Sequence, residues 1–145
     1  MTAAREVPVP VAELNEEELL QWGARFSLSL TAPAFVTLSG DLGAGKTTLI
    51  RAIVRAQGAL EPVTSQSYGL VREYASPRGA VIHLDLYRLR GPTELLQIGW
   101  EDVLRAQAIV LVEWPERAEG ALPVGHIALQ LAHLDGRPEV RRLSW

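Results

Sequence analysis

One short segment of the chain has the glycines, lysine and threonine of a phosphate-binding loop. It runs from Gly40 to Thr47, reads GDLGAGKT and matches the pattern G-x-x-x-x-G-K-[ST]. Glycine lets backbone N–H groups converge on a polyphosphate with no Cβ atoms in the way. The Lys46 ammonium can reach the β and γ phosphates, and the Thr47 hydroxyl can bind Mg²⁺. The segment predicts a site for a nucleoside triphosphate; the alternative is a glycine-rich turn that only starts a helix.

The only lysine of the chain lies in this segment. Of 14 Lys and Arg residues, Lys46 alone is lysine, and phosphate sites use its compact ammonium on a flexible stem. A guanine-specific switch protein of this type would read its base with an Asn-Lys-x-Asp motif. That motif requires a second lysine, so ATP is favoured over GTP as the nucleotide.

Two acidic residues near the ends of apolar segments are candidate partners of the metal. Asp85 lies in VIHLDLYRL, where alternation with period two places it on one strand face with His83 and Tyr87. Glu113 ends the apolar run AIVLVE, where a carboxylate can bind Mg²⁺ or orient the attacking water. As alternatives, Asp85 could pair with a nearby arginine, and Glu113 could be an ordinary cap or turn acid.

Other polar residues give weaker signals. A strand histidine such as His83 is more often a hydrogen-bonded structural residue than a catalytic one. Glu116 follows Pro115 and fits the first turn of a short helix. The segment EPVTSQSYGLV is rich in hydroxyl groups, which could meet the γ-phosphate or the metal and order the loop in the ATP state. Hydroxyl-rich loops are common, so spacing alone does not decide this point.

Apolar periodicity and turn residues predict alternating strands and helices. Helices are expected at 15–30, capped by Asn15, and at 46–58, with a broken helical stretch at 91–107. Strands are expected at 34–39, 67–74, 80–89, 108–113, 126–134 and 139–145, the last two forming a hairpin. This order indicates an α/β fold, a single P-loop NTPase-like domain over residues 1–145, with a mixed parallel and antiparallel sheet flanked by helices.

Composition narrows the class of protein. The hydrophobic content of 48% and the charged content of 21% are ordinary for a globular domain. There is no cysteine, no apolar run of membrane-spanning length and no signal-peptide pattern at the N-terminus, so we expect a cytoplasmic protein with no membrane partner. Direct binding of nucleic acid typically uses a cluster of basic residues on one face. The net charge of −3 and the scattered arginines of this chain do not indicate such a face.

Four blocks of the sequence, in this order, resemble the TsaE (YjeE) family of small bacterial ATPases needed for the threonylcarbamoyladenosine modification of tRNA. They are GDLGAGKTTL, VTSQSYGLV, HLDLYRL and VEWPE, within residues 38–116. The first block is generic, whereas HLDLYRL followed by EWPE is specific. The resemblance implies an Mg²⁺-dependent ATPase that resets a complex of TsaD and TsaB between turnovers. It would meet tRNA only through that complex and would not itself transfer the threonylcarbamoyl group.

The resemblance also implies roles for individual residues. ATP and its product ADP would be held at the phosphates by Gly43, Ala44, Gly45, Lys46, Thr47 and Thr48. Thr47 and Glu113 would bind Mg²⁺, and Asp85 would lie beside the metal and the catalytic water, so Glu113, Asp85 and Lys46 are the expected catalytic residues. Thr64 and Ser65 would belong to the switch. Adenine would lie near Glu16 and, at the other end of the chain, near Gly136 and Arg137.

The switch departs from the family pattern, which usually reads Ser-Pro-Thr and then an aromatic residue. Here the order is Ser65-Gln66-Ser67-Tyr68, so the proline is replaced and the backbone gains freedom and an N–H donor. A looser switch is expected. No arginine finger is identifiable, so slow hydrolysis by the isolated protein is expected as well. The alternative function is a small-molecule P-loop kinase, but no lid insertion rich in arginine separates the motifs.

Overall fold

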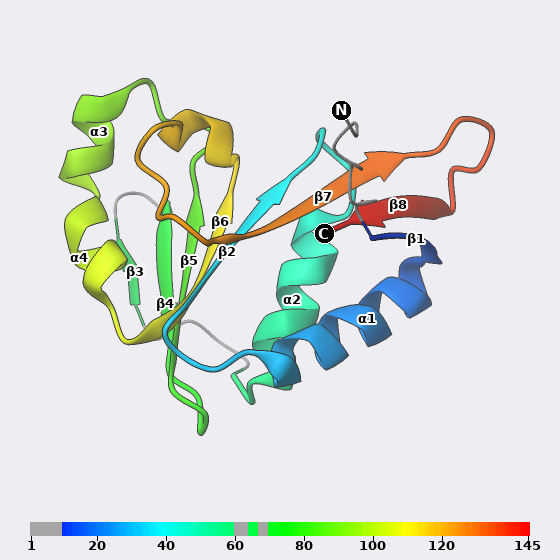
Figure 1. The fold of residues 1–145 in the computed structure, drawn as a ribbon, viewed down its shortest axis with the longest axis horizontal. Coiled ribbons are helices and arrows are strands. Elements are labelled where there is room, and N and C mark those ends of the chain that lie inside the picture. The colour runs from blue at the N-terminus through cyan, green and yellow to red at the C-terminus, as the bar shows by residue number, and fades with distance from the viewer. Residues whose placement is uncertain (1–9, 60–63, 67–69) are drawn as a thin grey trace, which may run out of the picture.

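The computed structural model describes residues 10–59, 64–66 and 70–145, and within them one mixed sheet has helices on both faces (Figure 1). The strands are β1 (Val11–Asn15), β2 (Ala34–Ser39), β3 (Thr64–Gln66), β4 (Val71–Tyr74), β5 (Ala80–Asp85), β6 (Ala108–Glu113), β7 (Ile127–His133) and β8 (Val140–Ser144). The helices are α1 (Glu16–Ser29), α2 (Lys46–Ala56), α3 (Pro92–Gln97), α4 (Trp100–Arg105) and the 3-10 helix η2 (Pro115–Ala118).

The strand order is β1-β8-β7-β2-β6-β5-β4-β3. The four central strands β7, β2, β6 and β5 are parallel, and antiparallel pairs form both edges. Parallel neighbours need crossover connections, which here contain helices. The predicted α/β fold with a mixed sheet is confirmed. The carboxyl ends of β2, β5 and β6 meet at one edge of the sheet, and this edge holds the candidate site.

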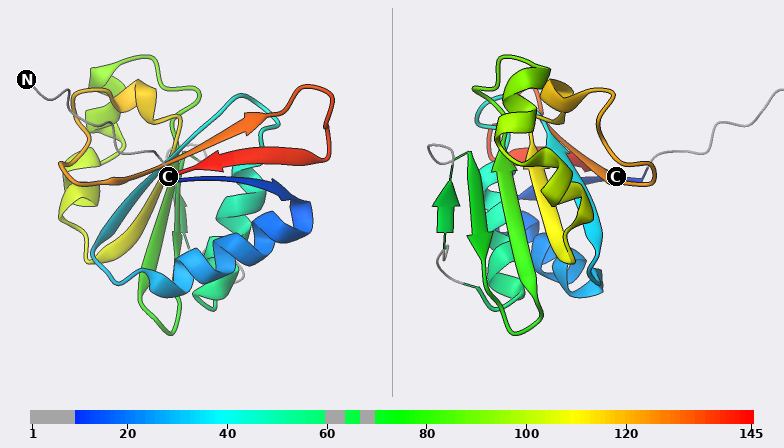
Figure 2. Two further views of the ribbon diagram at one scale, coloured as in Figure 1. Left: turned by 45° about the vertical axis from the view of Figure 1, so that its right-hand side comes forward. Right: turned by 90° about the vertical axis from the view of Figure 1, so that its left-hand side faces the viewer.

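Helices α1 and α2 cover one face of the sheet, and α3 and α4 cover the other (Figure 2). α1 begins as predicted with a capping box, in which the Glu18 N–H donates to Asn15 Oδ1 at 2.8 Å and the Asn15 N–H donates to Glu18 Oε1 at 3.1 Å. A Cβ on Gly23 would lie 2.9 Å from the Ala52 Cβ. Glycine therefore allows α1 to pack closely against α2 and hold the helix that follows the glycine-rich loop.

β6 is shared by two hydrophobic cores. All six of its residues are buried, and alternate side chains enter opposite cores. Leu111 packs with Leu38 and Leu49 on the side of α1 and α2. Val110 packs with Trp100 on the side of α3 and α4. The continuous apolar run of the sequence is thus a strand covered on both faces, as expected for a central parallel strand.

The structure differs from the predicted elements in four places. β1 was not predicted, because its pairing with β8 is a contact between distant parts of the chain. β3 occupies part of the predicted switch loop. The strand predicted at 80–89 ends at Asp85, because Asp85 Oδ1 accepts the Tyr87 N–H at 3.0 Å and turns the chain. The strand predicted at 67–74 starts at Val71 as β4, and its residues 67–69 lie outside the described residues.

The helices of this fold are short or amphipathic. Among the residues that the structure describes, no helix has both the length and the apolar character needed to cross a membrane.

Candidate functional site

The glycine-rich loop connects β2 to α2 and has backbone conformations that favour glycine. Gly40, Gly43 and Gly45 have φ values of +149°, +78° and +104°. A Cβ on Gly40 would also lie 2.4 Å from the Leu131 carbonyl oxygen, so this position has no room for a side chain. Gly45 gives no side-chain cap to α2. The first N–H groups of the helix therefore remain free to bind an anion, which the helix dipole also favours.

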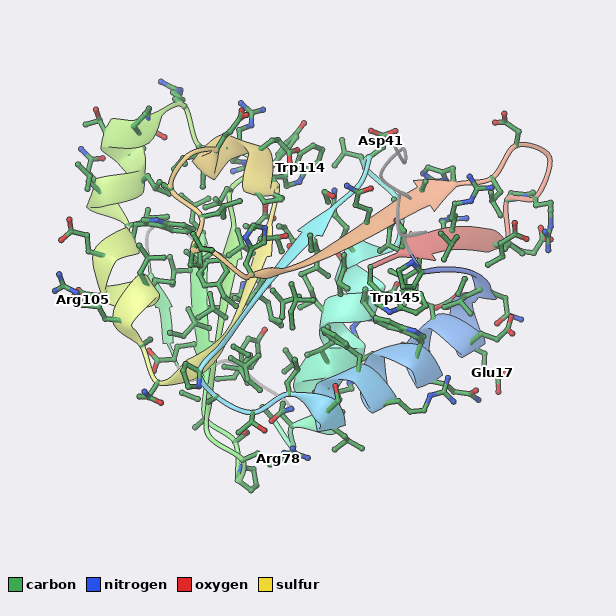
Figure 3. All side chains as sticks on the ribbon, in the orientation of Figure 1. Glu17, Asp41, Arg78, Arg105, Trp114 and Trp145 are labelled. Atoms are coloured by element: carbon green, nitrogen blue, oxygen red, sulfur yellow. The ribbon has the colours of Figure 1, made fainter. Side chains whose placement is uncertain are left out.

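Lys46, the first residue of α2, is held against the loop. Only 6% of this residue is exposed, and its Nζ donates to the Gly40 carbonyl oxygen. Nζ also lies 3.8 Å from the centroid of the Trp114 ring, a cation–π contact. Trp114 follows β6 with a positive φ of 56° and packs against Tyr87 at 5.0 Å between ring centroids. Figure 3 shows Trp114 beside the edge of the sheet where the loop begins.

The two predicted acidic residues lie on neighbouring parallel strands. The sheet register pairs Asp85 of β5 with Glu113 of β6, and Glu113 with Leu38 of β2. Both carboxylates line the same cavity of about 290 Å³ as the loop residues Lys46 and Thr47. The structure therefore brings together four residues that are separated in the sequence, two from the loop and two from strand ends.

A third residue, His83, contacts Glu113 within the buried part of the site. Its Nε2 lies 2.8 Å from Glu113 Oε2, and the exposed fractions are 8% for His83 and 6% for Glu113. A buried carboxylate needs such a partner, because an unpaired buried charge is costly. The sequence placed His83 on one strand face with Asp85, but it did not indicate the contact with Glu113.

The donor groups at this site suit Mg²⁺ bound together with a polyphosphate. Within the described ranges, no three His, Cys, Asp or Glu side chains gather in a metal cluster. Mg²⁺ does not need such a cluster, since proteins commonly bind it through one or two carboxylates while phosphate and water oxygens complete the shell. The Thr47 hydroxyl and the Glu113 carboxylate would supply the protein ligands.

A second cavity lies on the other side of the loop, where adenine was predicted. It has a volume of about 590 Å³ and is lined by Glu16, Gly45, Thr48 and Arg141 among others. Gly136 and Arg137 do not line it; Arg137 Nη1 instead lies 2.7 Å from Glu13 Oε2. Arg141 was not singled out from the sequence, although its Nη2 donates to the Gly43 carbonyl oxygen at 3.3 Å.

The predicted switch residues lie at the far edge of the sheet. Thr64 pairs with Glu73 of β4, and Ser65 pairs with Arg72. The side chains of these two switch residues, and the switch residues Ser67 and Tyr68, lie outside the described part of the structure. Glu116 is exposed in η2 and does not line the cavity of Glu113, in keeping with the turn position expected for it.

Comparisons with known proteins identify the family. The family model described as "Threonylcarbamoyl adenosine biosynthesis protein TsaE" matches residues 14–142. The tRNA threonylcarbamoyladenosine biosynthesis protein TsaE of Haemophilus influenzae is 37% identical over 135 residues, which are 90% of this chain and 85% of that protein. The protein of the same name from Nostoc sp. is 40% identical over 107 residues, 71% of this chain and 65% of that protein.

A solved structure has the same fold. The crystal structure of Bacillus subtilus YdiB matches with a TM-score of 0.70 and 25% sequence identity, and the match covers 96% of this chain and 86% of that chain. The family match spans the glycine-rich loop, both strand-end acids and most of the C-terminal hairpin. The chain therefore belongs to the TsaE family of tRNA threonylcarbamoyladenosine biosynthesis proteins.

Proposed function

We propose that this protein binds and hydrolyses ATP with Mg²⁺ and so resets the TsaB–TsaD complex between rounds of tRNA N6-threonylcarbamoyladenosine synthesis. The observation that supports the proposal is the cavity that Lys46, Thr47, Asp85 and Glu113 line together. Phosphoryl transfer depends mainly on positioning and on electrostatic stabilisation of the phosphates. These four side chains supply a cation, a hydroxyl and two carboxylates within one site.

The loop side of the cavity would bind the phosphates. Backbone N–H groups at the start of α2 would donate to the phosphate oxygens. The Lys46 ammonium would neutralise charge on the β and γ phosphates, and it is already held within the loop by the Gly40 carbonyl oxygen. Because Lys46 starts with most of its surface covered, little side-chain freedom is lost when it meets a phosphate.

The strand side of the cavity would hold the metal and the water. Bound Mg²⁺ supplies positive charge that offsets the charge of the phosphate oxygens. Thr47 and Glu113 would hold it, and His83 would keep the Glu113 carboxylate in a fixed orientation. Asp85 Oδ1 accepts the Tyr87 N–H, and Asp85 Oδ2, which has no hydrogen bond among the described residues, would accept one from the attacking water.

Reconstituted tRNA threonylcarbamoylation under multiple-turnover conditions tests the proposal. With substrate tRNA in excess over TsaB and TsaD, we expect product to stop near one equivalent of the complex when this protein is absent. Adding it with Mg·ATP should restore repeated turnover, and the Lys46→Ala variant should not. Equal product with and without the protein would contradict the role. Phosphate appearing on a metabolite, with little ADP formed in its absence, would indicate a kinase instead.

His83→Leu is expected to lower ATP turnover by about 10- to 100-fold, the usual effect of removing a group that orients a metal ligand. The physical reason is that the Glu113 carboxylate loses its hydrogen-bond donor while staying buried. The loss should appear mainly as a higher Mg²⁺ concentration for half-maximal hydrolysis, measured by titrating Mg²⁺ at saturating ATP.

Two further variants separate positioning from folding. His83→Gln keeps a donor and should recover much of the activity. His126→Gln is the control, because the His126 ring bonds only the Pro123 carbonyl oxygen among the described residues. An unchanged Mg²⁺ requirement in a folded His83→Leu protein would rule out the positioning role.

A further inference from the structure

A third cavity, of about 420 Å³, lies between α2 and the strands β4 and β5. It meets the candidate site at one end, because Thr47, Asp85 and Glu113 line both cavities. Its most distinctive side chains are three arginines, Arg51, Arg55 and Arg72. We call this cavity the arginine trough. The proposed ATPase mechanism uses none of these arginines.

The three arginines come from two opposite walls. Arg51 and Arg55 follow Thr47 at intervals of four residues along α2, so the three side chains share one helix face. Arg72 of β4 is paired in the sheet with His83 of β5. The helix face and the sheet face enclose the trough, with the α2 residues Ile50 and Val54 supplying apolar surface between the charges.

The three arginines of the trough have no ion-pair partners within the described residues. By contrast, Arg137 and Arg142 of the C-terminal hairpin both approach Glu13. The chain as a whole has a net charge of −3. Three guanidinium groups outnumber the two carboxylates, Asp85 and Glu113, that line the same trough, and unpaired guanidinium groups are strong donors to oxyanions.

The spacing of the arginines suits carboxylates on an extended chain. Positions four apart on a helix are separated by about 6 Å along its axis. Alternate residues of an extended strand point the same way and are separated by about 6.6 Å. A segment with acidic residues at alternate positions would therefore offer one carboxylate to Arg51 and the next to Arg55. Arg72, on the facing wall, could bind either carboxylate from the other side.

Single-stranded nucleic acid fits the trough less well. Such ligands need exposed aromatic rings on which bases stack. Among the described residues that line the trough, the aromatic one is Tyr74, and it is only 8% exposed. We propose that the arginine trough binds an extended acidic segment of a partner protein. This inference goes beyond the proposed function, since it concerns three arginines that the proposed mechanism does not use.

Binding of a short peptide tests the inference without any nucleotide. The probe is a fluorescein-labelled peptide of six residues with glutamate at alternate positions, titrated with the full chain and followed by fluorescence anisotropy. We expect saturable binding that weakens as salt is added, because exposed charge pairs are screened. The same peptide with glutamine in place of glutamate should not bind. ATP hydrolysis plays no part in this measurement, so its outcome is independent of the proposed function.

Arginine variants locate the site. Arg51→Gln, Arg55→Gln and Arg72→Gln should each weaken peptide binding by about threefold, a typical value for an exposed ion pair, and the triple variant by about tenfold or more. Arg105→Gln is the matched control, since Arg105 is exposed on α4 beyond the opposite face of the sheet (Figure 3). No binding by the glutamate peptide, or equal loss with Arg105→Gln, would overturn the inference. Tighter binding of a six-nucleotide RNA would also overturn it.

Discussion

Lys46→Ala is expected to abolish Mg·ATP turnover and to weaken nucleotide binding strongly. The side chain is the only lysine of the chain, and its ammonium lies inside the glycine-rich loop against the Gly40 carbonyl oxygen. Removing it takes away the positive charge that faces the β and γ phosphates. Loss of one such electrostatic group costs about 100-fold or more in rate. The measurement is ADP formation at saturating Mg·ATP, together with the Kd for a fluorescent ATP analogue.

Lys46→Arg tests whether charge alone is sufficient. We expect it to remain nearly inactive, because a larger, planar guanidinium does not fit a residue position that is only 6% exposed and whose compact ammonium lies against the Gly40 carbonyl oxygen. Lys46 is buried, so thermal unfolding of both variants must be compared with that of the parent protein. Hydrolysis at the parental rate by a folded Lys46→Ala protein would remove the phosphate-binding assignment.

Glu113→Ala is expected to abolish hydrolysis while leaving nucleotide binding more intact than Lys46→Ala does. The Glu113 carboxylate lies at the end of β6 and pairs with His83, so it would act on the metal and the water, not on the adenosine or the phosphates directly. We expect a fall in turnover of about 100-fold or more. The Kd for the ATP analogue, measured without and with Mg²⁺, should show that the loss is confined to the Mg²⁺-dependent part of binding.

Glu113→Gln and Glu116→Ala are the companion variants. Glu113→Gln keeps a group that can accept a hydrogen bond from His83, so it should fold normally and still fail to hydrolyse ATP. Glu116 lies three residues further along and is exposed on η2, so its removal should leave turnover unchanged. Unchanged hydrolysis in Glu113→Ala, or equal loss in Glu116→Ala, would show that the metal carboxylate lies elsewhere.

The sequence predicted those parts of the fold that depend on local patterns. The run from Ala108 to Glu113 is a buried parallel strand because all its residues are apolar up to the acid. The capping box at Asn15 and the glycines of the loop also follow from residue type and short-range spacing. For the same reason, residue order alone assigns Lys46 and Thr47 to the start of a helix.

The remaining features depend on contacts between distant segments. β1 forms because it pairs antiparallel with β8. The residue pattern of Val11–Asn15 alone does not predict this pairing. The hydrogen bond between His83 and Glu113 requires the register of β5 on β6. Likewise, Arg72 joins the α2 arginines only when β4 folds back along β5. In the sequence, Arg51, Arg55 and Arg72 are separated by up to 21 positions, whereas in the structure they line one cavity.

The pairing of Asp85 with Glu113 across β5 and β6 limits how a partner could control this protein. Neighbouring strands keep a separation of about 4.8 Å that is set by the backbone hydrogen bonds between them, and both of these strands are packed inside the sheet with helices on its two faces. The spacing of the two acids is therefore a fixed property of the framework. If the protein hydrolyses ATP as proposed, a partner would control the reaction through groups that are not fixed by the sheet, such as Lys46 and the glycine-rich loop beside the Trp114 ring or the predicted switch.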